Sequence, residues 1–293
     1  MLEKTKGKTY NITKEVRTVM TNEEIELKKE KNMEIIQKMK LMDDTFMTAC
    51  FQDNPKATEL VLRIIMDQED LLVEKVSVQD FIKNLFGRSV RLDVYATDNT
   101  GKKYNIEVQN ENAGATPKRA RYNSALIDCW ELPSGTDWEK LPETYVVFIT
   151  EKDVLGAGLP IYHINRYIEE TKQPFRDAAH IIYVNGEIQD DTPLGRLMRD
   201  FHCTKAEDMY YKDLADMVKH FKESEEGVKK MCRIADELRE EGREEGRAEA
   251  IASELLKSVE RLQTKMKISV QEALDLLGKT VSEYENAKKM LSK

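Results

Sequence analysis

Two neighbouring segments with alternating apolar residues, 88–98 and 102–110, each carry an acid in their interior, Asp93 and Glu107. A polar turn that ends in Gly101 joins them. The period of two and the glycine predict an antiparallel hairpin. If a three-residue loop ends in Gly101 with a positive φ, residues whose numbers sum to about 200 lie opposite each other. The sequence therefore predicts that Asp93 faces Glu107 directly.

The predicted hairpin places both acids among polar neighbours on one face, because strand side chains alternate between two faces. Gln109 is on the face of Glu107, two residues further along the strand. Two acids opposed on one face repel by roughly a few tenths to 1 kcal/mol unless a positive charge lies between them. A divalent cation is the simplest such charge. We expect the other face of the first strand to carry three apolar side chains: Val90, Leu92 and Val94.

Composition and charge restrict the class of protein. The chain has 293 residues, of which 40% are hydrophobic and 34% are charged, with a net charge of −8. The acidic balance argues mildly against a large DNA footprint, although it leaves room for a local basic groove. None of the four cysteines forms a CxxC pair, and we read no signal peptide and no membrane span. We therefore expect a reduced cytoplasmic protein without a zinc site.

The remaining periodicity predicts a mixed sheet with helices on its faces, which is an α/β fold. Three parts follow from it: a charged helical extension (1–40), an α/β domain (41–205) and a helical C-terminal region (206–293). We expect further strands at 71–81, 144–150 and 180–185, helices at 21–40, 44–66 (broken at Asn54-Pro55) and 117–132, and a short helix or irregular segment at 161–170.

The C-terminal region has two signals of its own. Gly242, Gly246 and Ala250 form a stripe of small residues, which suits either a close helix–helix contact, such as a homodimer, or a hinge. Residues 268–291 predict two short helices around Gly278 in a layout like a helix-turn-helix. Acids at the start of the second helix would repel phosphates, which favours a structural or protein-contact role. We expect each of these helices to begin with a capping box, formed by Ser269 with Glu272 and by Ser282 with Glu285.

Paired acids on adjacent strands are suited to metal-dependent phosphodiester cleavage. That reaction needs carboxylates to hold Mg²⁺, a positioned water and a group that stabilises charge. Asp93 and Glu107 are the candidate metal ligands, and Gln109 is placed to orient water or a phosphate.

The chain resembles the PD-(D/E)XK nuclease superfamily, and within it the Rpn-like recombination-promoting nuclease and putative transposase family. The resemblance covers roughly residues 41–200. It implies a restriction-endonuclease-like core and a DNA substrate. The segments that carry it are DDTFMTACF (43–51), ELVLRIIM (59–66), SVRLDVYATD (89–98), YNIEVQ (104–109) and KRARYNSALID (118–128).

The resemblance also implies roles for individual residues. An acid on the first core helix often completes the metal site, and Glu59 is the best match. The usual lysine of the superfamily is Gln109 here, as in the branch that this chain resembles, so Lys103 on the same strand face is a candidate substitute. The helix after the hairpin is the expected phosphate-binding element, with Arg119 and Tyr122 on one face and Lys118 and Arg121 adding attraction.

Three functions remain open from the sequence. The first is a DNA endonuclease that depends on Mg²⁺ or Mn²⁺, linked to recombination or mobile elements. The second is a catalytically degenerate module on the same fold that binds nucleic acid or protein; the neutral Gln109 and the net charge favour it. The third is an assembly factor whose C-terminal helices drive oligomerisation.

Overall fold

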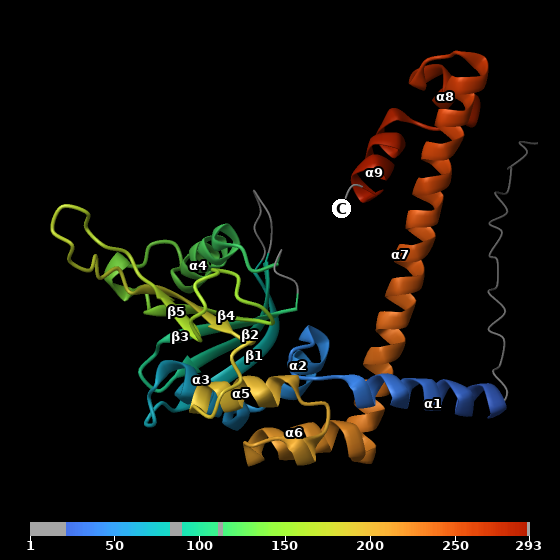
Figure 1. Ribbon diagram of the computed structural model, residues 1–293. Coiled ribbons are helices and arrows are strands. Elements are labelled where there is room, and N and C mark those ends of the chain that lie inside the picture. The colour runs from blue at the N-terminus through green and yellow to red at the C-terminus, as the bar shows by residue number, and fades with distance from the viewer. Residues whose placement is uncertain (1–21, 83–89, 111–113, 292–293) are drawn as a thin grey trace, which may run out of the picture.

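The fold is built on a six-stranded mixed sheet, which lies in the left half of Figure 1. The computed structural model describes residues 22–82, 90–110 and 114–291. The strand order is β1-β2-β3-β4-β6-β5, with the β3–β4 and β4–β6 pairs parallel and the others antiparallel. The strands are β1 (Val73–Ile82), β2 (Val90–Asp98), β3 (Lys103–Gln109), β4 (Thr144–Thr150), β5 (Ile161–Ile164) and β6 (Ala179–Asn185).

The fifth strand corrects the expectation of a helix or irregular segment at 161–170. Ile161–Ile164 pairs antiparallel with β6 at the edge of the sheet. Four residues are too few to show a period of two, and this edge strand is only half-buried at its start and exposed at its end.

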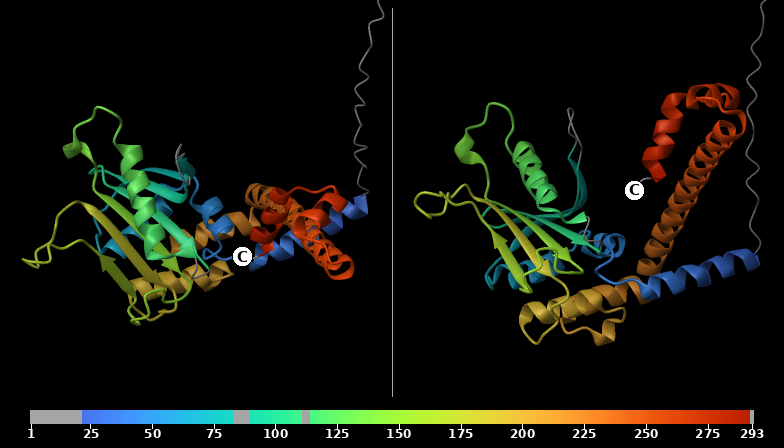
Figure 2. Two further views of the ribbon diagram at one scale, coloured as in Figure 1. Left: turned by 90° about the horizontal axis from the view of Figure 1, so that it is seen from above. Right: turned by 45° about the horizontal axis from the view of Figure 1, so that its top comes forward.

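The helices cover both faces of the sheet (Figure 2). On one face α4 (Pro117–Glu131) crosses from β3 to the parallel β4, begun by Pro117 in its first turn and capped by Thr116, whose side chain accepts the Arg119 N–H. The predicted break at Asn54-Pro55 is confirmed, because Asn54 caps a new helix there. The other face carries α2 (Asp44–Phe51), α3 (Pro55–Met66), α5 (Pro193–His202) and α6 (Lys212–Glu223), and the short 3₁₀ turns are Trp138–Lys140 and Ala206–Asp208.

The larger hydrophobic core extends beyond the middle of the chain. It lies under α2, α3, α5 and α6, and it includes Leu214 and Phe221 of α6 and Met231 at the start of the next helix. Ile36 of the N-terminal helix is also fully buried in it. The predicted boundaries at residues 40 and 205 remain predictions, but the packing on both sides of each is continuous.

The hairpin has the predicted register from Val94 to Thr97, but the predicted pair of Asp93 and Glu107 is not part of the β-ladder. Val94 pairs with Ile106 and Thr97 with Lys103, and Gly101 has a φ of +88°. Among the described strand residues, the β2–β3 pairing stops at Val94, one residue before Asp93. At Asp93 the regular alternation of β2 side chains between the two faces of the sheet is also interrupted.

Leu92 packs on the α4 side of the sheet, in the same cluster as Tyr95, whereas Val94 lies in the core on the opposite side. The expectation that Val90, Leu92 and Val94 share one face was therefore wrong. A strand that leaves its ladder is free to turn its side chains, and β2 leaves the ladder at Asp93.

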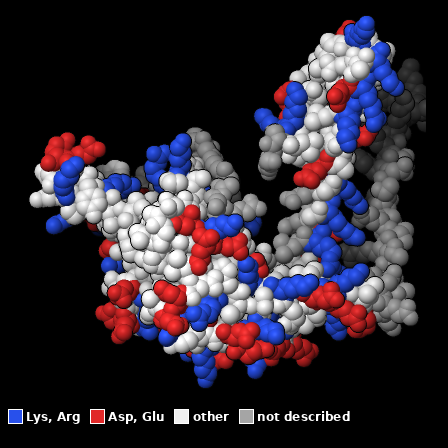
Figure 3. Space-filling view, viewed as in Figure 1, with Lys and Arg blue, Asp and Glu red and all other residues white. Residues whose placement is uncertain are grey.

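The C-terminal region is one long helix with two short ones folded back on it (Figure 1). These are α7 (Glu225–Met266, 42 residues), α8 (Val270–Leu277) and α9 (Val281–Leu291). The two glycines of the small-residue stripe lie within α7, exposed, and a Cβ added at either would meet no atom within 4 Å in the described chain. Figure 3 shows side chains of both charges along this region. No described helix is long and apolar enough to cross a membrane.

The capping boxes of the short helices agree with the sequence in one of two cases. Ser269 and Glu272 form the predicted box at α8. At α9 the predicted pair of Ser282 and Glu285 was wrong, because Thr280 and Glu283 cap the helix two residues earlier. Both pairs satisfy the same spacing, and the turn at Gly278 (φ +64°) brings the chain back into helix at Val281.

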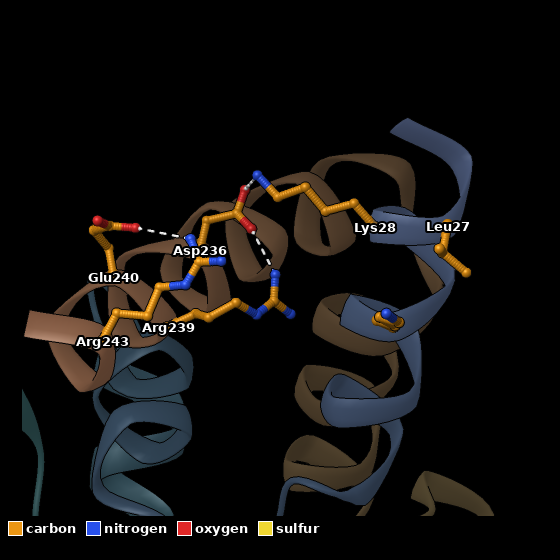
Figure 4. Close-up of a pocket in the computed structure, with 7 residues that line it drawn as sticks. Leu27, Lys28, Asp236, Arg239, Glu240 and Arg243 are labelled. Atoms are coloured by element: carbon orange, nitrogen blue, oxygen red, sulfur yellow. Dashed lines mark hydrogen bonds and ion pairs between the residues drawn. The ribbon is translucent and has the colours of Figure 1, made fainter. Parts of the chain in front are cut away.

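The N-terminal helix α1 (Asn22–Lys38) crosses the base of α7 and is fixed there by polar contacts (Figure 4). The Nδ2 of the buried Asn32 donates to Asp236 (3.2 Å), and its Oδ1 accepts from Arg239 (2.6 Å). Lys28 completes the cluster with an ion pair to Asp236 (2.8 Å). The hollow beside this crossing, about 440 Å³, is lined by Leu27, four cations and two acids, and both acids form ion pairs with cations of the lining. Residue 21, where the sequence predicts that this helix begins, lies outside the described residues.

Candidate active site

The two acids of the hairpin are buried where β2 and β3 separate. Asp93 is 7% exposed and Glu107 is fully buried. Asp93 Oδ2 accepts the backbone N–H of Val108 (3.3 Å), a group that a continued β-ladder would bind by its own backbone. The separation of the strands thus directs the Asp93 carboxylate towards the strand that carries Glu107.

Each carboxylate oxygen of Glu107 accepts a side-chain hydrogen bond, and the backbone N–H of Asp93 also stabilises this carboxylate. Its Oε1 accepts from Nδ2 of Asn105 (3.0 Å), which lies two residues earlier on the same face of β3. Its Oε2 accepts from Nη2 of Arg119 (2.9 Å) in the first turn of α4. The crossover from β3 to α4 therefore brings a guanidinium onto the buried acid.

Arg119 also organises the residues around it. Its Nη1 donates to Oε1 of Gln109 (3.0 Å) and to the carbonyl of Gly114 (2.8 Å). Its guanidinium lies 5.8 Å from the centre of the Phe148 ring, a cation–π distance. Arg119 thus places a positive charge beside Gln109, at the point where the strand itself has only a neutral amide.

Gly114 makes this arrangement possible. A Cβ at position 114 would lie 2.0 Å from Oε1 of Gln109 and 3.3 Å from Nη1 of Arg119. Any larger residue would therefore displace the Gln109 amide from its contact with Arg119.

Burial raises the pKa of both acids. The pKa of Asp93 is raised from 3.8 to about 9, first by burial and then by the charges of Glu107 and Asp44, against the Val108 N–H and Arg119. Burial likewise raises the pKa of Glu107, although Asn105 and Arg119 oppose the shift. Two buried acids that repel each other in this way are suited to a divalent cation, whose charge would compensate both.

A groove of about 870 Å³ opens over Asp93. Asp44, at the start of α2, lies on its wall together with Asp93. The rest of its described lining is rich in cations and polar groups, so the two acids lie in a groove that is otherwise largely basic. The residues that form these walls include Arg91, Lys118, Arg119, Arg121, Tyr122 and Asn123.

Most of the predicted site residues meet here. Arg119 contacts Glu107 and Gln109 directly. Lys118, Arg121 and Tyr122 line the groove over the acids. The helix predicted to face a phosphate is therefore the helix beside the candidate metal ligands.

Two predicted residues have other partners. Glu59 accepts the backbone N–H of Val73 (2.9 Å) and forms an ion pair with Arg63 (2.7 Å), so it closes the junction between α3 and β1. Lys103 forms an ion pair with Glu131 (3.2 Å) at the far end of β3, four residues or about 13 Å from Glu107. Neither side chain lines the groove.

The structure adds three residues that our reading of the sequence missed. Asp44, and not Glu59, lines the groove with Asp93, and its charge raises the pKa of both buried acids. Its signal was present, because it lies in the DDTFMTACF segment that carried the resemblance. Asn123 likewise lies in the KRARYNSALID segment of the resemblance, whereas Gly114 gave no signal. Asn123 is fully buried, and its amide has no hydrogen-bond partner among the described residues.

The donor set fits a divalent ion such as Mg²⁺ or Mn²⁺, which prefers carboxylate oxygens. Asp93 and Glu107 would supply these oxygens, and a bound cation would compensate the charges that burial disfavours. Within the described ranges, however, no three His, Cys, Asp or Glu side chains are grouped closely enough to form a complete metal site. Arg119 is the cation on Glu107 in this arrangement.

Comparison with known proteins identifies the family of the chain. A family model described as PD-(D/E)XK nuclease family transposase matches residues 62–253, about two thirds of the chain. The match spans every strand of the sheet and α4. No curated protein and no solved structure matches the chain. The six-stranded mixed sheet flanked by helices is the α/β fold expected for this family.

Proposed function

We propose, from the premise that this chain belongs to the PD-(D/E)XK nuclease family transposases, that it is a Mg²⁺-dependent DNA endonuclease. One observation carries the proposal. Arg119 of α4 places its guanidinium between Glu107 and Gln109, so the positive charge that the Glu-X-Gln strand lacks comes from the neighbouring helix.

In this proposal Asp93 and Glu107 hold the metal, and Asp44 adds negative charge beside them. Bound Mg²⁺ would supply charge stabilisation and an activated water. Gln109 orients Arg119 or a water molecule through its amide. Arg119 stabilises the developing charge on the phosphate, the task usually given to lysine in this superfamily.

The basic walls of the groove give the DNA its place. Lys118 and Arg121 are exposed on the first turns of α4, and Tyr122 lies beside them. Lys and Arg attract any phosphate backbone, and Tyr can donate a hydrogen bond or stack on a base. We propose that this face of α4 holds the DNA strand with its phosphate over Asp93.

The test is a cleavage assay on purified full-length protein with Mg²⁺ or Mn²⁺. We expect Asp93→Asn and Glu107→Gln each to lose cleavage by about a thousandfold, the scale seen when a catalytic charge stabiliser is removed. Lys103→Ala and Glu59→Gln serve as controls that should retain it. Cleavage that persists in both acid variants would refute the site, and loss in Lys103→Ala would return that lysine to it.

A second function has one observation in its favour. Glu107 is fully buried and its Oε2 is occupied by Arg119, as expected for a degenerate site that only binds nucleic acid or protein. Calorimetric titration with Mn²⁺ separates the two readings. Binding that disappears in Glu107→Gln supports a functional metal site, whereas DNA binding without any metal binding supports the degenerate module.

A homodimer through the C-terminal helices is a further part of the proposal. The open surface at Gly242 and Gly246 supports it, because nothing in the described chain covers these positions. Light scattering after size exclusion tests it on full-length protein and on a chain that ends near residue 240, beyond the buried Ala235. Equal oligomeric states would reject it.

The link to recombination is tested in cells. We propose that Glu107→Gln lowers the frequency of DNA exchange relative to the wild type, and an unchanged frequency would remove recombination from the proposal.

A further inference from the structure

We propose that Arg119 is an internal counter-ion for Glu107 that exchanges with the metal, so that the guanidinium and the metal compete for one carboxylate. This inference rests on the proposed function and concerns how the same site is controlled.

While Arg119 is in place, both carboxylate oxygens of Glu107 already accept hydrogen bonds. The carboxylate is fully buried, Asn105 occupies Oε1 (3.0 Å) and Arg119 occupies Oε2 (2.9 Å). A Mg²⁺ ligand must approach its ion to about 2.1 Å. A divalent ion at that distance would lie against the guanidinium and be repelled by it.

Arg119 can move whereas Glu107 cannot. Glu107 is fully buried in the interior of β3 and pairs with Phe148 of β4. The Arg119 side chain is 38% exposed and starts from the first turn of α4, at the wall of the groove. Its other hydrogen bonds go to neutral acceptors, the Gln109 amide and the Gly114 carbonyl. Of the three partners, only Glu107 offers a charge that a competing cation can take away.

After its release from Glu107, the Arg119 guanidinium has the groove beside it. Once released from Glu107, its guanidinium faces the groove that Lys118 and Arg121 line. A guanidinium binds a phosphate bidentately, with geometry that matches its two N–H pairs. One side chain thus protects the buried acid before the metal binds and becomes available for the DNA phosphate afterwards.

Titration of full-length protein with MnCl₂ in a calorimeter, without DNA, tests the exchange. We expect Arg119→Gln to bind Mn²⁺ at least about tenfold more tightly than the wild type, because a hydrogen bond to a charged group is worth roughly this factor. Arg121→Gln is the matched control. It removes the same charge from the same helix and the same groove, and we expect its Mn²⁺ affinity to stay within about twofold of the wild type.

A second variant guards against misfolding, since Arg119→Gln leaves a buried acid unpaired. Arg119→Lys keeps the charge but loses the fork, so we expect an intermediate Mn²⁺ affinity. We also expect single-turnover cleavage at saturating Mn²⁺ to fall in Arg119→Gln, so that metal affinity and cleavage change in opposite directions.

The outcomes distinguish this inference from the proposed function. If Arg119→Gln binds Mn²⁺ no more tightly than the wild type, or if Arg121→Gln gains as much, the exchange is refuted while a metal-dependent nuclease still stands. If the wild type and all three arginine variants bind no Mn²⁺, the exchange and the proposed metal-dependent nuclease are both refuted. Binding that is unchanged in Glu107→Gln would refute the exchange by placing the metal elsewhere.

Discussion

Replacing Asp93 by Asn should stabilise the metal-free protein, and the gain should grow with pH. In the folded chain the pKa of this buried acid is raised to about 9, whereas its ordinary value is 3.8. At pH 7 the folded state therefore keeps a proton that the unfolded state has lost. Each pH unit between the two values costs about 1.4 kcal/mol, so the penalty at pH 7 is up to about 4 kcal/mol.

The sign follows from proton binding. The contribution of Asp93 to stability is complete below pH 3.8 and is lost as the pH rises towards about 9, because the folded state binds more protons than the unfolded state in this window. Asparagine has a similar shape, can accept the Val108 N–H and does not titrate. We expect the advantage of Asp93→Asn to increase by roughly 3 kcal/mol between pH 6 and pH 8.

Urea unfolding at pH 6, 7 and 8 in EDTA measures this difference. Asp98→Asn on the same strand is the control with the opposite sign. Burial opposes its ionisation, but hydrogen bonds from Thr100 and Tyr104 prevail and lower the pKa of Asp98. We expect Asp98→Asn to be less stable than the wild type by about 1–3 kcal/mol, without a trend across this pH range. A difference for Asp93→Asn that does not vary with pH would refute the reasoning.

Three further changes test contacts away from the groove. Glu59→Gln should lower the free energy of unfolding in urea by about 1–2 kcal/mol, because it weakens the hydrogen bond from the Val73 N–H. It should leave the Mn²⁺ affinity unchanged, and a loss of affinity would contradict the placement of Glu59 outside the groove. Lys222→Met should cost about 2–4 kcal/mol, since the buried ammonium donates to three backbone carbonyls; equal stability would show that these bonds contribute nothing. Asn32→Ala should speed hydrogen exchange in α1 by about tenfold, because it removes the Asn32 hydrogen bonds to Asp236 and Arg239 of α7; protection equal to the wild type would show that these bonds do not fix α1.

The sequence was most informative where local chemistry determines geometry. The glycine at position 101 and the alternation of apolar residues were enough to predict the hairpin register, since a three-residue turn allows few alternatives. Pro117 was enough to predict the start of the helix that carries Arg119. Both features depend on residues within a few positions of one another.

Contacts between distant segments were less accessible. Glu59 and Asp44 both lie on helices before the sheet, and only the packing of α2 near Asp93 distinguishes the acid in the groove from the acid at the β1 junction. The reversal of Leu92 depends on where the β2–β3 ladder ends, which no pattern in β2 reveals. The cap at α9 depends on the choice between two overlapping pairs with equal spacing.

The contact between α1 and α7 determines how far the end of the molecule can reach. Beyond the buried Ala235, α7 continues for about 30 residues, or roughly 45 Å, before α8 and α9 begin. A rigid rod of that length works as a lever. A tilt of about 10° at the contact of Asn32 with Asp236 and Arg239 would move the tip of α7 by about 8 Å. This is more than two base-pair steps of DNA at roughly 3.4 Å each. A small polar cluster at the base of the helix therefore sets the position of everything at its tip.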